Sequence, residues 1–178
     1  ETLFRTLEKL KEKGKIRHYG ISIHNPQEGT LAMKMGKPEA IQVMFNIFRQ
    51  EARNQLFQAA MENGVGIIAR EPLANGFLTG KHNAAETFPE GDIRHHFPRD
   101  YILNLVLATE QLKFLGGRNR TLAQAALRFV LDQKEVSTVI PGAKTPQQVE
   151  ENLWVSDLPP LTGEELLRIR ILREQGFA

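Results

Sequence analysis

The apolar positions of the chain change repeatedly between helical and strand spacing. Leu3, Phe4, Leu7 and Leu10 recur at intervals of three and four residues, which predicts a helix over 1–13 that ends at Gly14. The segment 15–22 that follows is predicted to be a strand. The chain thus opens with one helix and one strand.

The same alternation continues through the first half of the chain. Asn25 and Pro26 predict an N-cap and a first helical position, with Glu28 as a capping-box carboxylate, for a helix that runs to about residue 35. A strand is predicted over 39–46, a helix over 51–63 that Gly64 ends, and a short buried strand over 65–69.

The second half opens with a long segment, 71–98, that contains several Pro and Gly residues and is predicted to be a loop. Two helices are expected over 99–115 and 121–133, and a fourth strand over 136–140. Thr145 and Thr162 predict the caps of two further helices. Trp154 is expected to pack these last helices onto the sheet.

Strands that alternate with helices predict an α/β domain with a parallel sheet of four strands and helices outside it, covering 1–178. The first three strands begin about 25 residues apart, the length of one β/α unit. Four such strands form either a small open, doubly wound sheet or half of an eight-stranded barrel. Periodicity alone does not separate these two architectures.

Composition excludes several classes of function. The 178 residues carry a net charge of +2, too small to indicate nucleic-acid or membrane binding. There is no cysteine, which excludes disulfides and thiolate chemistry and is consistent with a cytoplasmic protein. The sequence begins at Glu1 inside a helical pattern, so we expect that a preceding segment is absent from it.

The turn after the fourth strand has the clearest candidate chemistry. Gly142 would let backbone approach a ligand, the helix start would offer free N–H groups, and Lys144 would add a cation, as phosphate binding requires. Gln148, Glu151 and Asn152 share one face of the helix that follows and could bind an adenosine phosphate. These local features alone favour an ordinary capped helix with a polar face.

Two other segments are less specific. The residues that follow the third strand, 70–81, could form either a ligand loop or a simple turn. His95 and His96 are adjacent and have no carboxylate partners at metal-ligand spacing, so we expect exposed loop histidines and no metal site.

Taken together, the segments after the four strands resemble the aldo-keto reductase family. The similar motifs are Gly-Ile-Ser at 20–22, Gln42 on the second strand, Glu-Pro-Leu-Ala-Asn-Gly-Phe-Leu-Thr-Gly-Lys at 71–81 and Ile-Pro-Gly-Ala-Lys-Thr-Pro at 140–146. The resemblance implies the C-terminal half of a (β/α)₈ TIM barrel, with the N-terminal half as its missing partner. It also implies an NADPH-dependent oxidoreductase that reduces aldehydes or ketones, with NAD as the less favoured cofactor.

The resemblance assigns a role to each candidate residue. Ser22 and Gln42 would hold the nicotinamide carboxamide. Arg70 stands where the family usually has an aromatic residue against the nicotinamide ring, and a guanidinium can also stack on a ring. The pyrophosphate would lie along Glu71, Pro72, Leu73, Ala74 and Asn75, with Lys81 and Arg94 nearby; the adenosine end would meet Gly142, Lys144, Gln148, Glu151 and Asn152.

No catalytic residue is assigned to this chain. The family's Tyr, Lys, Asp and His come from the first half of its barrel, and neither Tyr19 nor Tyr101 matches the motif. The chain alone is therefore expected to be inactive, and the full-length protein to be the enzyme. The alternative is a non-catalytic module that binds a nicotinamide cofactor and regulates a partner.

Overall fold

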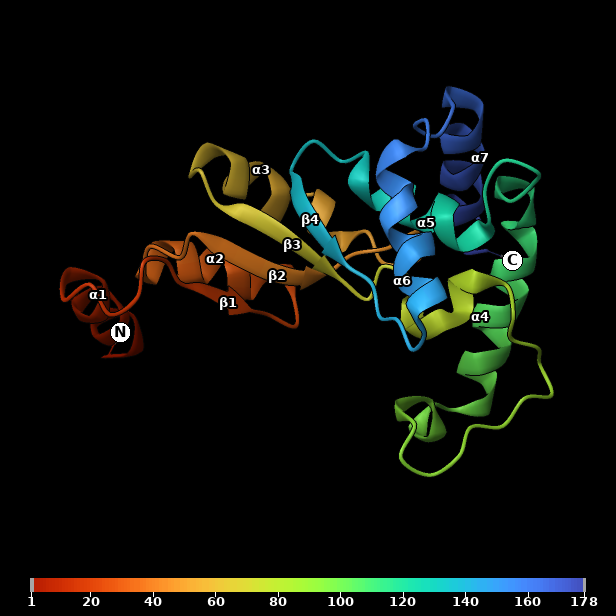
Figure 1. Cartoon of the computed structure of the whole chain (residues 1–178), viewed down its shortest axis with the longest axis horizontal. Helices are drawn as coiled ribbons and strands as arrows, with labels where there is room; N and C mark the ends of the chain where they lie inside the picture. The colour runs from red at the N-terminus through yellow and green to blue at the C-terminus, as the bar shows by residue number, and fades with distance from the viewer. Residues whose placement is uncertain (1, 178) are drawn as a thin grey trace.

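A computed structural model describes residues 2–177, and its centre is a parallel four-stranded sheet (Figure 1). The strands are β1 (Gly20–Ser22), β2 (Ala40–Met44), β3 (Gly66–Arg70) and β4 (Val136–Ile140), and each neighbouring pair is parallel. Their order in the sheet, β1-β2-β3-β4, is the order of the sequence. A doubly wound sheet reverses its strand order at a switch point, so this order is that of a singly wound sheet.

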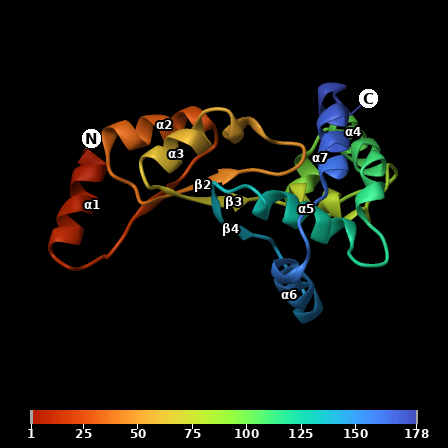
Figure 2. The same ribbon diagram turned by 90° about the horizontal axis from the view of Figure 1, so that it is seen from above.

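Seven α-helices of the described residues alternate with these strands or follow them. The helices are α1 (Thr2–Glu12), α2 (Pro26–Met35), α3 (Leu56–Glu62), α4 (Arg99–Gln111), α5 (Leu122–Leu131), α6 (Pro146–Leu153) and α7 (Gly163–Glu174). Short 3₁₀ segments occur at Glu51–Arg53, Ala74–Thr79, Ile93–His96, Lys113–Leu115 and Trp154–Asp157. In Figure 2, α2 and α3 lie along one face of the sheet, and α1 lies at the opposite end of the molecule from α4 and α7.

The core lies between the sheet and the helices on that face. Ile41 and Val43 of β2 and Ile67 and Ala69 of β3 are at most 1% exposed, as the period-two pattern of the strands predicts. They join one apolar cluster with residues of α3 and α5, and Phe45 packs at 4.8 Å from Phe57 between ring centroids. Because side chains alternate along a strand, burial of these residues places their neighbours in β2 and β3 on the opposite face of the sheet.

The opposite face of the sheet carries the alternate residues in layers. Gly20, Ala40 and Gly66 are partners across the first three strands, so the first layer has no side chain larger than a methyl group. A Cβ on Gly20 would lie 2.6 Å from the carbonyl oxygen of Ala40, so this close approach requires glycine. Ser22, Gln42, Ile68 and Thr138 form the next layer, and Met44, Arg70 and Ile140 the last.

Three predicted elements differ from the structure. The helix predicted over 99–115 ends at Gln111, and the 3₁₀ turn Lys113–Leu115 follows it. The strand predicted over 15–22 has only three residues, Gly20–Ser22, because β1 pairs with β2 alone and their pairing begins at Gly20 and Ala40. The helix predicted over 51–63 is divided into a 3₁₀ turn at Glu51–Arg53 and α3. The break lies next to Arg53, which donates to Gln133 just beyond the end of α5, so a long-range contact competes with helix continuity here.

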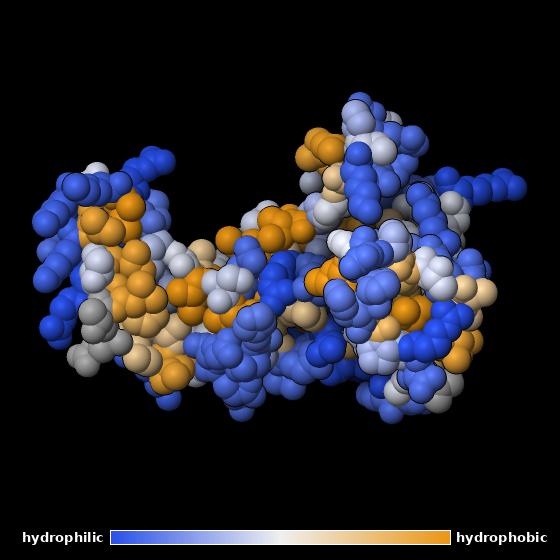
Figure 3. All heavy atoms as spheres, turned by 90° about the horizontal axis from the view of Figure 1, so that it is seen from below, coloured by the Kyte–Doolittle hydropathy of each residue, from blue (hydrophilic) through white to orange (hydrophobic). Residues whose placement is uncertain are grey.

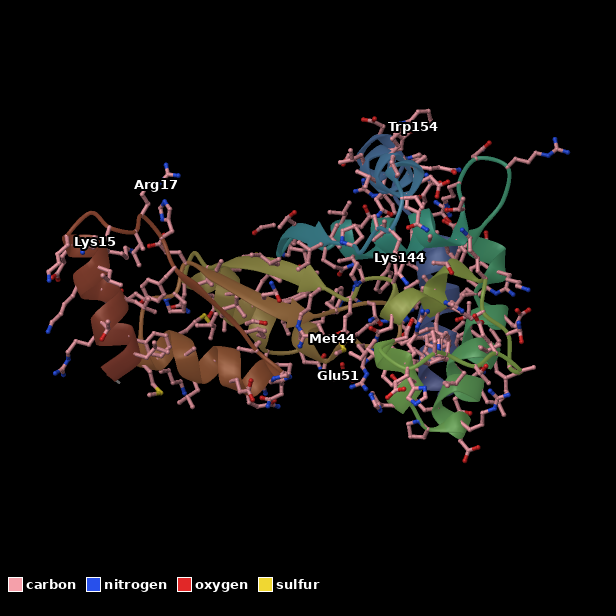
Figure 4. The ribbon with its side chains drawn as sticks, turned by 60° about the horizontal axis from the view of Figure 1, so that its bottom comes forward. Lys15, Arg17, Met44, Glu51, Lys144 and Trp154 are labelled. Atoms are coloured by element: carbon pink, nitrogen blue, oxygen red, sulfur yellow. The ribbon has the colours of Figure 1, made fainter. Side chains whose placement is uncertain are left out.

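The caps were predicted correctly, but the packing of Trp154 was not. Thr145 accepts from the backbone N–H of Gln148, and Thr162 and Glu165 form a reciprocal capping box. Trp154, expected to pack on the sheet, is 70% exposed. Figure 4 shows it at the outer tip of the α6 region, where it points away from the sheet.

Candidate functional site

The segment after β3 has an unusual backbone. Glu71, Ala74 and Asn75 have φ values of 53°, 48° and 55°, in the left-handed region that L-residues seldom adopt. Each such residue costs about 1–3 kcal/mol and persists only where surrounding contacts hold it. Such strain is common at ligand-binding sites, so this loop is a candidate functional segment.

Side chains from three directions hold this loop. The buried Asn46, just after β2, donates from Nδ2 to the carbonyl oxygen of Glu71 over 2.8 Å. Asn75 donates to Glu71 Oε2 over 3.1 Å, and Arg70 Nη1 donates to Glu71 Oε1 over 2.5 Å. Glu71 is thereby fixed through both its backbone and its carboxylate at the carboxyl end of the sheet.

Arg94, from the far part of the long loop, returns to the same place. Its Nη1 donates to the carbonyl oxygen of Asn75 over 3.2 Å, and its Nε and Nη2 donate to Asp92 over 2.8 and 2.6 Å. The guanidinium lies 4.2 Å from the ring centroid of Phe88. Arg94 therefore joins the strained turn to the 3₁₀ segment that follows Asp92.

His82 completes this network, and its contacts indicate which ring nitrogen accepts. Arg94 Nη1 lies 2.9 Å from His82 Nε2, and a guanidinium can only donate, so Nε2 accepts. The proton of the neutral ring is then on Nδ1, which donates to Glu86 over 2.7 Å. Gly76, with φ at 94°, leaves room for this pair, since its Cβ would lie 3.2 Å from His82 Nε2.

Arg94 also controls the charge of Asp92. Its side-chain hydrogen bonds, followed by its backbone N–H, hold the pKa of the Asp92 carboxyl well below its usual range. Lys144, across the cavity, acts in the same direction through its charge. Four of the five N–H groups of Arg94 are engaged within the loop, so its main contact with any ligand would come through the remaining Nη2 hydrogen.

The turn between β4 and α6 forms the other wall. The backbone N–H of Lys144 donates to Gln148 Oε1 over 2.7 Å, and Thr145 caps the helix. Gln147 donates to Glu151 Oε1 over 3.0 Å on the exposed side of α6. Figure 4 shows Lys144 on the stretch of chain that joins the sheet to α6. Its ammonium group is exposed, at the start of a helix.

These two walls enclose a cavity of about 710 Å³, a size typical of small-molecule sites. Eleven predicted residues line it: Glu71, Pro72, Leu73, Asn75, Lys81, Arg94, Gly142, Lys144, Gln148, Glu151 and Asn152. Sequence reasoning missed other lining residues, including His82, Asp92, Thr121 and Ala123. The first two lie in the long loop that the Pro and Gly content had indicated, which was the available signal.

Four predicted residues lie outside this cavity. Ala74 is 8% exposed and joins the apolar core. Ser22, Gln42 and Arg70 lie on the face of the sheet opposite the apolar core, which we call the helix-free face. There Ser22 Oγ donates to Gln42 Oε1 over 3.1 Å. Arg70 Nη2 donates to the carbonyl oxygen of Ile23 over 3.1 Å, but its buried Nε has no acceptor among the described residues. A buried N–H without an acceptor costs about 1–3 kcal/mol.

The two tyrosines lie away from this site. Tyr19 precedes β1, at the opposite end of the strand, where its hydroxyl donates to Glu8 over 2.7 Å and accepts from the N–H of Lys37. Burial, followed by the hydrogen bond to Glu8, raises the pKa of Tyr19. Tyr101 is on α4 and packs edge-on against Phe97. Neither hydroxyl is in a position to deliver a proton at the carboxyl end of the sheet.

Within residues 2–177, no cluster of three or more His, Cys, Asp or Glu side chains could hold a metal ion. His95 Nδ1 donates to the carbonyl oxygen of Phe88 over 2.9 Å, and the His95 ring packs edge-on against His96. Over the same residues, none of the helices has the length and apolar character needed to cross a membrane.

Comparison with known proteins shows which family the sequence matches and which solved structures share the fold. A sequence model of the aldo/keto reductase family matches residues 1–174. The aldo-keto reductase yakc of Schizosaccharomyces pombe, whose name gives NADP(+), is 33% identical over 159 residues, which are 85% of this chain and 47% of that protein. The NADH-specific methylglyoxal reductase of Escherichia coli is 28% identical over 151 residues, 83% of this chain and 46% of that protein.

A solved structure shows the same arrangement. The holo form of an aldo-keto reductase from Bacillus halodurans is 30% identical and superposes with a TM-score of 0.72. The superposition covers 95% of this chain and 54% of that one. The chain thus spans about half the length of the relatives and the solved structure that it matches.

Proposed function

Because the chain belongs to the aldo/keto reductase family, we propose that it carries most of the nicotinamide-cofactor site of an NAD(P)H-dependent oxidoreductase. We infer further that residues 1–178 are the C-terminal half of its (β/α)₈ barrel. The singly wound order of four parallel strands supports this half-barrel, and so does the share of the relatives' length that the chain covers. The N-terminal half of the barrel would be its structural partner.

The single observation that carries this function is the cavity at the carboxyl ends of β3 and β4. It brings together eleven residues from three separate segments, all of which the sequence had suggested for cofactor binding. Three cations, Lys81, Arg94 and Lys144, line it beside the carboxylates of Glu71, Asp92 and Glu151. Lys and Arg side chains are the groups that pair with phosphate. Ligands bind at this end of the strands in parallel α/β folds.

The residues present fit a nicotinamide dinucleotide. Ser22 and Gln42 offer a hydroxyl and an amide on the helix-free face, suited to a carboxamide. Arg70 would lie against the ring, oriented by its hydrogen bonds to Glu71 and to the carbonyl oxygen of Ile23. Pro72, Leu73, Ala74 and Asn75, next to Glu71, would follow the pyrophosphate, and Gly142, Lys144, Gln148, Glu151 and Asn152 would meet the adenosine end.

The chemistry and the choice of cofactor follow from these assignments. When bound, the reduced cofactor supplies a hydride to the carbonyl carbon of an aldehyde or ketone. Lys144 at the start of α6 favours NADPH, because only NADPH carries a 2′-phosphate that an ammonium group can pair with. One relative is named for NADP(+) and another for NADH, so the family alone does not determine which cofactor is preferred. In this chain the preference would depend on Lys144 and its neighbours.

The proton for the forming alkoxide would come from outside residues 1–178. Tyr19 is bonded to Glu8 and Lys37 at the wrong end of β1, and Tyr101 is held on α4. The chain's own contribution is to bind and orient the cofactor and to exclude water from its phosphates. The catalytic groups belong to the preceding half of the barrel.

The test compares the full-length protein with residues 1–178 alone. We expect the full-length protein to bind NADPH, measured by fluorescence titration, and to oxidise it with a reactive aldehyde such as 4-nitrobenzaldehyde. Residues 1–178 alone should show no turnover, and turnover there would contradict both the half-barrel and the site assignments. Tight binding without turnover in the full-length protein would instead favour a non-catalytic cofactor-binding module.

A further inference from the structure

Arg70 occupies a specific place on the helix-free face of the sheet. It is the last residue of β3, in register with Met44 on one side and Ile140 on the other. Gln42 and Ser22 lie on the same face, one layer below. The side chain of Arg70 is 17% exposed, so its charge is largely shielded from solvent. A positive charge in such a place acts over several ångströms with little screening.

Arg70 does not act alone, because Glu71 is tied to it. Glu71 Oε1 accepts from Arg70 over 2.5 Å, and its Oε2 accepts from Asn75 over 3.1 Å. The backbone of Glu71, with φ at 53° and its carbonyl oxygen held by Asn46, keeps the carboxylate in place. The ion pair therefore holds the positive guanidinium of Arg70 in a fixed place, and the carboxylate of Glu71 partly offsets its charge.

The orientation of the guanidinium is also fixed. Nη2 donates to the carbonyl oxygen of Ile23, just after β1, so the group spans from β3 toward the first strand of the sheet. Nε is buried and has no acceptor among the described residues. A guanidinium that two contacts orient is held in one position on this face, one layer above Gln42.

We propose that Arg70 and Glu71 set the relative affinity of this site for the reduced and oxidised forms of the cofactor, with Arg70 favouring the reduced form. This inference rests on the proposed function, which puts the nicotinamide ring against Arg70. The oxidised ring carries a positive charge and the reduced ring is neutral. A fixed cation beside the ring disfavours only the oxidised form, and Glu71 moderates that effect through its opposite charge.

The consequence is a site from which the spent cofactor leaves readily. An aromatic side chain at this position would stack on both forms of the ring and carry no net charge to separate them. Arg70 can still contact the ring face but adds a charge-dependent difference. Arg70 is on this argument a specificity-determining residue for the oxidation state of the cofactor.

The test measures the dissociation constants of NADP⁺ and NADPH for the full-length protein and takes their ratio, NADP⁺ over NADPH. Arg70→Gln should lower this ratio about tenfold, the effect of one partly shielded charge near another. Arg70→Lys should keep most of the ratio. Glu71→Gln, which retains an oxygen for Asn75, should raise it, because the moderating charge is gone.

Lys144→Ala is the matched control, because this cation lines the cavity at its other wall. It should weaken both oxidation states alike and leave the ratio unchanged. If the wild type binds both forms and Arg70→Gln shifts the two affinities by the same factor, this inference is wrong and the proposed function stands. If the wild type binds neither form, the proposed function fails and this inference with it. Should Arg70→Gln not fold, an unchanged ratio in Glu71→Gln overturns the inference on its own.

Discussion

Asn46 Nδ2 donates to the carbonyl oxygen of Glu71 over 2.8 Å and so ties the end of β2 to the strained turn that follows β3. The Oδ1 atom of Asn46 accepts from the backbone N–H groups of Phe48 and Arg49, both over 2.9 Å. The residue is 1% exposed. One amide side chain thus satisfies three backbone groups at the carboxyl end of the sheet.

We predict that Asn46→Ala lowers the free energy of unfolding by about 1–3 kcal/mol, because it leaves buried backbone groups without partners. Urea unfolding followed by circular dichroism measures this loss. Asn63→Ala is the control, since the exposed Asn63 makes only a local bond to the carbonyl oxygen of Ala59. Equal stability of the two variants would mean that the turn after β3 does not depend on Asn46.

Asp92 gives the site a pH dependence whose sign can be stated. The hydrogen bonds of Arg94 hold its pKa below the usual range, so the folded state binds its proton less readily than the unfolded chain. The stability that this carboxylate contributes is complete above the unfolded value of about 3.9 and is lost as the pH falls below it.

We therefore predict that the long loop opens as the pH falls below about 4. Hydrogen exchange of residues 81–97 should rise over this range in the wild type. Asp92→Asn should show faster exchange already at neutral pH and a weaker dependence on pH. Asp157→Asn, which changes an exposed carboxylate far from the loop, should behave as the wild type. Loop exchange that is independent of pH in the wild type would exclude this role for the Asp92–Arg94 pair.

Sequence reasoning located most of the fold because its signals are local. The strand at 136–140 and the caps at Thr145 and Thr162 depend on apolar runs and on side chains three residues away. The predictions of a strand over 15–22 and of a continuous helix over 51–63 were wrong. Both boundaries depend on contacts between segments, such as the hydrogen bond from Arg53 to Gln133. Propensity within a segment carries no information about such contacts.

The candidate site divides in the same way. The segments 71–75 and 142–152 were found because polar residues after parallel strands meet at one end of a sheet. The contact between His82 and Arg94 joins two parts of a loop that has no periodicity, so the sequence did not indicate it. Asn75 and Gly76 suit left-handed backbone, but the same conformation at Glu71 and Ala74 has no sequence signal.

The open sheet has a consequence for residues 1–178 in isolation. Within the described residues, β1 pairs only with β2 and β4 only with β3, so each has a free edge. The exposed face of the sheet is mixed: Ile140 is 44% exposed, and Ser22, Gln42 and Thr138 are polar. Figure 3 shows the surface hollowed over the middle of the molecule, between α1 and the helical end, with apolar atoms along the hollow.

We predict that residues 1–178 self-associate, because free strand edges and an uncovered sheet face favour pairing between chains. Sedimentation velocity should show dimers or larger species. Ile140→Lys puts a charge on the exposed face and should shift the population toward monomer without changing the circular dichroism spectrum. A monomer with a sharp thermal transition in the unmodified chain would contradict the half-barrel and favour an independent open sheet.

Under the proposed function, Lys144 at the start of α6 is the residue that would favour NADPH over NADH. Lys144 is exposed at the cavity wall, and the N–H of its own backbone is already satisfied by Gln148. Its ammonium group is therefore the charge that this turn offers to a 2′-phosphate. A charge-assisted contact of this kind is worth roughly 5- to 150-fold in affinity.

We predict that Lys144→Ala weakens NADPH binding by a factor in that range and leaves NADH binding nearly unchanged. Fluorescence titration of both cofactors measures the difference, which should shrink at high salt because charge contacts are screened. Lys81→Ala is the control, since Lys81 lines the part of the cavity assigned to the pyrophosphate that both cofactors share. It should weaken both equally. An equal loss for the two cofactors in Lys144→Ala would mean that the turn serves only to cap α6, and that any preference for NADPH comes from other residues.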